Sequence, residues 1–99
     1  MKDVKITVVK KVEHKDLIKE YENPISHACG HIEGQTFISK NAERPDGLCE
    51  SAWQNLYPFV FALASGARDI YDGWMKNKNS AMICCNDGFR PVSFYIESI

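Results

Sequence analysis

One segment of this chain repeats its apolar residues with the period of an α-helix. Apolar side chains recur at spacings of three and four residues: Cys49, Ala52, Trp53, Leu56, Val60 and Leu63. Residues at these spacings share one helical face, so the pattern predicts a main helix over residues 48–65 with that face against a core. Gly66 follows where a left-handed C-terminal cap is expected. The other apolar segments of the chain must then pack against this helix.

Pro58 lies inside the predicted helix. Its ring removes one backbone hydrogen-bond donor and clashes with the preceding turn. We therefore expect either a kink near Tyr57 or two short helices that meet there. Phe59 and Phe61 flank the apolar stripe, which predicts that most of the helix circumference is buried.

Several short segments have the pattern of β-strands. Residues 4–8 alternate apolar with polar side chains, as in a strand with one buried face. Residues 34–39 read as a turn that enters a second strand. The segments 81–85 and 92–96 flank the turn sequence at 86–88, so they predict a β-hairpin.

These elements predict the fold class. A short helix over residues 16–22 is expected to end before Pro24, because the residue before a proline avoids helical geometry. The whole set predicts an α+β fold, in which a small antiparallel sheet of about four strands packs on the Pro-kinked helix 48–65. A chain of 99 residues builds one core, so residues 1–99 are expected to form a single domain.

Charge and hydropathy exclude several classes of protein. The formal net charge of −1 gives no electrostatic footprint for nucleic acid. No apolar run approaches the roughly 20 residues of a membrane span. The first residues alternate polar with apolar and do not resemble a signal peptide, so we expect a cytoplasmic protein. Structural disulfides are rare there, and the chain's four cysteines therefore favour metal or redox chemistry.

The densest group of potential metal ligands is the segment His27-Ala28-Cys29-Gly30-His31. If it is extended, all three ligand side chains project from the same face, although a turn at Gly30 would break that arrangement. Thiolate and imidazole together suit zinc or iron. No Cys-x-x-Cys pair accompanies them, and an equally weighted alternative is a buried Cys29 with the histidines at a loop edge.

The remaining cysteines lie far from this segment in the sequence. Cys49 falls at the predicted helix start, where backbone amides favour a thiolate, but it also belongs to the core stripe. Cys84 and Cys85 are neighbours in a predicted strand, so they point to opposite faces and only one can reach a shared site. Cys85 abuts the turn at 86–88 and is the better candidate, whereas Cys84 is expected to fill space.

Motifs over most of the chain resemble a small uncharacterised family of prokaryotic proteins of about this length, to which no reaction is assigned. The matching strings are Cys29-Gly30-His31-x-x-Gly34-Gln35-x-Phe37, Pro45-x-Gly47-Leu48-Cys49-x-x-Ala52, Leu56-Tyr57-Pro58, Trp74 and Cys85-x-Asp87. Members of the family more often carry Asp where this chain has Gln35, so position 35 is a weak candidate for an acid.

The resemblance implies a set of ligands. Four residues fall on the family's motif positions and form a Cys₃His set suited to zinc or iron: Cys29, His31, Cys49 and Cys85. His14, His27 and Cys84 do not fall on them. Such a set would join the loop, the helix start and the hairpin.

Three classes of function stay open. The leading expectation is a metal-binding domain that uses this Cys/His set. The second is a cysteine-thiolate enzyme or redox protein with Cys29 or Cys49 as the thiolate and His31 as its partner. The third is a non-catalytic binding or structural module with buried cysteines. The sequence does not identify a small-molecule ligand, and aromatic residues near Tyr71 and Trp74 permit a homo-oligomer.

Overall fold

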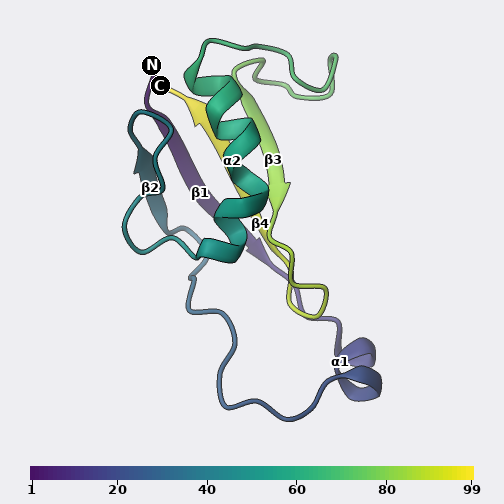
Figure 1. The fold of residues 1–99 in the computed structure, drawn as a ribbon. Coiled ribbons are helices and arrows are strands. Elements are labelled where there is room, and N and C mark those ends of the chain that lie inside the picture. The colour runs from purple at the N-terminus through teal and green to yellow at the C-terminus, as the bar shows by residue number, and fades with distance from the viewer.

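The computed structural model describes residues 1–99 as one sheet and two helices. The elements in chain order are β1 (Val4–Lys11), α1 (Lys15–Tyr21), β2 (Thr36–Ser39), α2 (Glu50–Ala64), β3 (Ser80–Cys84) and β4 (Val92–Ser98). The four strands form an antiparallel sheet in the order β2-β1-β4-β3, and α2 runs across one face of it (Figure 1). The predicted α+β fold, with about four antiparallel strands and one main helix, is confirmed.

The core lies between α2 and the two central strands. Over residues 4–8 of β1 and 92–96 of β4 every second residue is buried, which is the period of a strand with one covered face. The buried strand residues are Val4, Ile6, Val8, Val92, Phe94 and Ile96. They belong to one apolar cluster with Leu56, Val60 and Leu63 of α2. The buried strand residues repeat every two residues and the buried helix residues about every 3.6, and the two sets pack together in one core.

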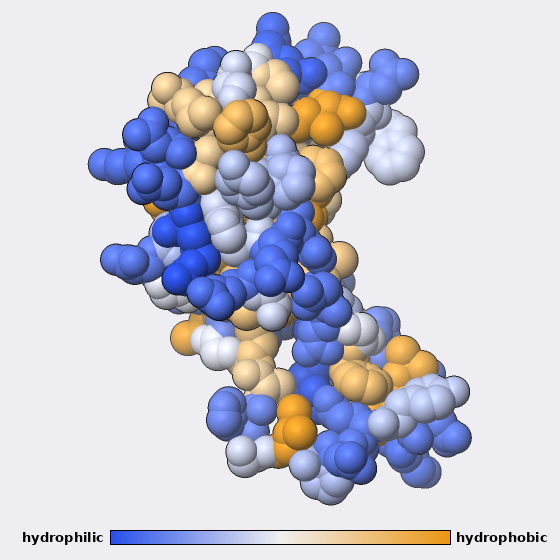
Figure 2. All heavy atoms as spheres, in the orientation of Figure 1, coloured by the Kyte–Doolittle hydropathy of each residue, from blue (hydrophilic) through white to orange (hydrophobic).

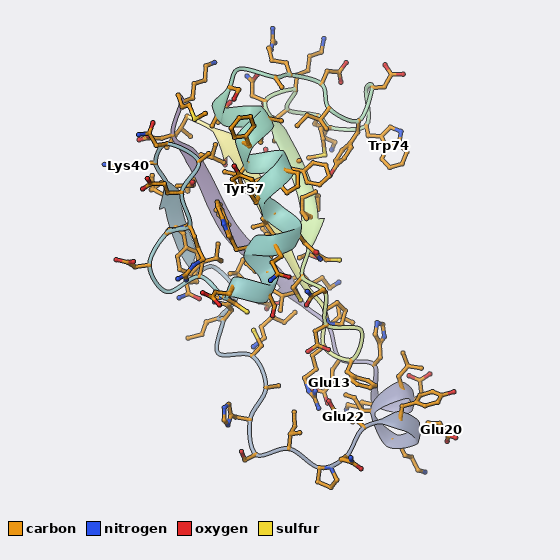
Figure 3. The ribbon with its side chains drawn as sticks, viewed as in Figure 1. Glu13, Glu20, Glu22, Lys40, Tyr57 and Trp74 are labelled. Carbon is orange, nitrogen blue, oxygen red and sulfur yellow. The ribbon has the colours of Figure 1, made fainter.

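Helix α2 begins and ends slightly inside the predicted range, with Cys49 as its N-cap and Ser65 as its C-cap. It is one continuous helix through Pro58, so the alternative of two short helices is wrong. The predicted burial of most of its circumference is also wrong. Tyr57 and Phe61 are 43% and 44% exposed, because the sheet covers only one side of the helix (Figure 3). No helix in the structure is both long and apolar enough to cross a membrane.

The segment that contains α1 extends away from the sheet. Helix α1 has no buried residue, and apolar side chains are visible on its surface (Figures 1 and 2). The carboxylate of Glu22, at the end of α1, accepts two hydrogen bonds from the Arg90 guanidinium at 2.6 and 3.0 Å. This bidentate ion pair attaches the segment to the connection between β3 and β4.

We predict that Leu56→Ala destabilises the protein by about 2–5 kcal/mol, the usual cost of a cavity in a packed core. Leu56 is fully buried between α2 and the sheet. Urea denaturation should show this loss, whereas Gln54→Ala on the exposed side of the same helix should change the free energy of unfolding by less than about 0.5 kcal/mol. Equal effects of the two substitutions would contradict the assigned helix face.

We predict a pH-dependent attachment of α1. Hydrogen bonds from Arg90 hold the pKa of Glu22 below its ordinary value of 4.5, against the opposing effect of burial. A carboxylate with a lowered folded pKa stabilises the fold above its unfolded pKa, and this contribution is lost as the pH falls through the folded pKa. Glu22→Gln should therefore reduce the hydrogen-exchange protection of α1 amides at about pH 7, and the difference from the wild type should vanish in acid, once the pH is below the folded pKa of Glu22.

The matched control is Glu20→Gln, because Glu20 lies on the same helix and makes no ion pair (Figure 3). It should leave the protection factors unchanged at both pH values. A reduction in Glu22→Gln that persists unchanged in acid would show that the ion pair does not hold the segment.

Candidate functional site

A cavity of about 600 Å³ opens where three segments meet: residues 28–31, the start of α2, and the connection that follows β3. Cys29, His31, Cys49 and Cys85 all line it. The structure thus brings together around one cavity the four residues that the sequence singled out. His14, His27 and Cys84 are not among the lining residues.

The segment around Cys29 reaches the cavity as a loop. Residues 27–31 belong to no strand, and of the three ligand residues Cys29 and His31 line the cavity whereas His27 does not. Cys29 and His31 line the cavity because the loop folds back toward α2. The backbone N–H of His31 donates to Cys29 Sγ at 3.4 Å, which fixes the two residues relative to each other.

The His31 imidazole connects this loop to the start of α2. His31 is only 7% exposed, and its Nε2 accepts a hydrogen bond from the backbone N–H of Cys49 at 3.2 Å. An accepting Nε2 carries no proton, so the neutral ring has its proton on Nδ1. Nδ1 lies 3.2 Å from Gln35 Oε1, to which it donates. Both ring nitrogens therefore have partners.

The neighbours of His31 hold its ring in this orientation. The rings of Phe37 and Phe94 contact it edge-on, with centroid distances of 5.6 and 5.8 Å. Gln35 Oε1 also accepts the backbone N–H of Ile32 at 3.3 Å, which orients the amide as an acceptor. Removal of the His31 acceptor would leave the Cys49 N–H without its partner, at a cost of about 1–3 kcal/mol if no water replaces it.

Two of the three cavity thiols accept hydrogen bonds from backbone N–H groups, and the third belongs to the N-cap residue of α2. Cys29 Sγ accepts the N–H of His31, and Cys85 Sγ accepts the N–H of Val92 at 3.3 Å. Cys49 is the N-cap of the 15-residue helix α2, and its side chain makes no capping hydrogen bond. Hydrogen-bond donors and helix N-termini both stabilise negative charge on sulfur. All four cysteines of the chain are free thiols.

Cys85 and Cys84 differ in position, as expected for neighbours. Cys85 follows the last residue of β3, and its N–H donates to Val92 O at 3.0 Å, so it stays paired with the β4 side of the hairpin. Its half-buried side chain lines the cavity, whereas Cys84 is exposed and lies outside it.

Several polar residues of the cavity were not predicted as site residues, and Arg90 and Gln35 make the most specific contacts among them. Arg90 lines the cavity while it binds Glu22, a residue 68 positions away, and no local sequence pattern indicates such a pair. Gln35 lines it as the acceptor for His31. His31 and Gln35 belong to the same motif string, but no sequence pattern indicated that their side chains are in contact.

The ligand side chains surround the cavity without converging on one point. No group of three or more His, Cys, Asp or Glu side chains is gathered closely enough to hold a metal ion. Binding of an ion would therefore require the thiols to rotate toward a common centre. Comparisons with protein-family models, with curated proteins and with solved structures found no match for the chain.

Proposed function

We propose that this protein binds a metal ion in the cavity through the thiolates of Cys29, Cys49 and Cys85. The observation that carries the proposal is that three cysteines from three distant segments line one cavity together with His31. Thiolates bind zinc and iron strongly, and the ligand set inferred from the sequence names these two ions.

The surroundings of the three sulfurs suit this role. Backbone N–H groups donate to Cys29 and Cys85, and Cys49 lies at the positive end of α2. Cysteine binds metals as the thiolate, and N–H donors of this kind are compatible with a charged sulfur. An ion bound here would join the loop, the helix start and the hairpin, and would therefore add to the stability of a small core.

His31 is the fourth candidate ligand. Its Nε2 lone pair points to the N–H of Cys49, so ligation would require that this amide lose its acceptor. The Nδ1–H bond to Gln35 could persist, because metal-binding histidines commonly donate their second ring nitrogen to an oxygen. A tetrahedral zinc or iron centre would gain its fourth donor at the expense of the bond to Cys49.

We predict that protein purified anaerobically, without added metal, contains about one zinc or iron ion per chain. Elemental analysis should show loss of that ion in Cys29→Ser, Cys49→Ser and Cys85→Ser. Cys84→Ser is the matched control and should retain it, since Cys84 lies outside the cavity. Wild-type protein that contains no stoichiometric metal and cannot be reconstituted with either ion would refute the proposal.

A second candidate function is thiolate chemistry at Cys49, which is exposed at the edge of the cavity and at a helix N-terminus. His31 could act as its base only after release from the Cys49 amide. This candidate predicts that iodoacetamide labels Cys49 of metal-free protein at least about tenfold faster than Cys29 and Cys85, in line with a stabilised thiolate. Equal labelling rates for all three thiols would rule out this second candidate function.

A further inference from the structure

Three aromatic side chains form a stripe along one flank of α2. The rings of Trp53 and Tyr57 lie 5.6 Å apart, and those of Tyr57 and Phe61 lie 6.0 Å apart. Tyr57 and Phe61 are nearly half exposed, and Trp53 is half-buried. None of the three lines the cavity, so the stripe is a separate surface. Exposed aromatic side chains gathered in this way are typical of protein interfaces.

The stripe has opposite charges at its two ends and none between them. Glu50 lies on the same flank as Tyr57, about two turns earlier, and it is the only charged residue of α2. Its side chain is 82% exposed, and its one ion-pair partner, Arg44, lies 3.8 Å away. At the other end, the N–H of Lys2 donates to Ala64 O at 2.8 Å. This bond places Lys2, which is exposed and makes no ion pair, beside the C-terminus of α2.

The stripe is complementary to a second copy of itself. Tyr57 is the central residue of α2, and Trp53 and Phe61 lie at equal distances on either side of it. A two-fold axis at Tyr57 makes the α2 helices of two copies antiparallel, so that Trp53 of each copy faces Phe61 of the other. The same axis brings Glu50 of each copy to the end of α2 that carries Lys2 in the other. Opposite charges therefore meet at both ends of the aromatic contact.

We propose that two copies of this chain form a two-fold symmetric dimer through the aromatic stripe of α2, with the two helices antiparallel and Tyr57 at the axis. The inference goes beyond the proposed function, because the cavity takes no part in the contact. Aromatic side chains near the centre of an interface supply most of the binding energy, and the charge pairs at its ends select the antiparallel orientation. One helix face is a small contact compared with the roughly 1,600 Å² of a standard interface, so the dimer dissociates at micromolar concentrations.

The test is sedimentation velocity of the full-length protein from about 1 µM to about 1 mM, a range that brackets micromolar dissociation. A reductant and a chelator ensure that neither disulfides nor a shared metal ion joins the chains. We expect a reversible monomer–dimer equilibrium. Tyr57→Glu should weaken it at least about tenfold, because two carboxylates would then meet at the axis. The matched control is Tyr21→Glu, the same change at a 74% exposed tyrosine of α1, which should leave dimerisation unchanged.

Charge reversal tests the antiparallel arrangement independently of the aromatic contact. Glu50→Lys should weaken the dimer, and the added substitution Lys2→Glu should restore it. Failure of this rescue would overturn the proposed arrangement. Wild-type protein that stays monomeric at about 1 mM would overturn the dimer itself. So would a dimer that Trp74→Glu abolishes and Tyr57→Glu does not, because Trp74 is 83% exposed in the loop between α2 and β3, away from the stripe (Figure 3).

Discussion

The candidate site depends on the hydrogen bond between the N–H of Cys49 and Nε2 of His31. The loop that carries Cys29 and His31 has no regular secondary structure, so its position relative to α2 must come from specific side-chain contacts. The buried imidazole supplies them, since it accepts from the helix start and donates to Gln35 between two aromatic edges. This hydrogen bond joins the loop directly to α2. Hydrogen bonds from Lys11 Nζ to His31 O and from the N–H of Gly34 to Val8 O hold the same loop against β1.

The sheet and α2 provide the frame on which this contact acts. Apolar packing against β1 and β4 fixes the axis of α2. It thereby fixes the position of the helix start, where Cys49 is the N-cap residue. Antiparallel pairing of β3 with β4 brings Cys85 to the same end of the sheet. The site therefore lies at the edge of the core, where Cys29 and Cys85 pack against the apolar cluster.

Much of the frame could be predicted from the sequence, because the apolar periods of α2, β1 and β4 are local and short. The four cavity residues could be proposed because Cys85, unlike Cys84, abuts the turn at 86–88, and because the motif resemblance separated His31 from His27. The role of His31 as a hydrogen-bond acceptor for the Cys49 N–H could not be predicted, because it depends on a contact between residues 18 positions apart. The Glu22–Arg90 pair could not be predicted either, because its residues are 68 positions apart. The exposed side of α2 could not be predicted because it depends on how many layers cover the helix, and apolar periodicity does not encode that number.

The most direct test of this account is the tautomer of His31 in metal-free protein, measured from long-range ¹H–¹⁵N correlations of the imidazole. The account predicts a neutral ring with its proton on Nδ1 and with Nε2 as an unprotonated acceptor. This pattern should appear together with slow exchange of the Cys49 amide proton. A neutral ring with its proton on Nε2 would contradict the account, because such a ring cannot accept from Cys49 and the loop would not be joined to α2 in this way.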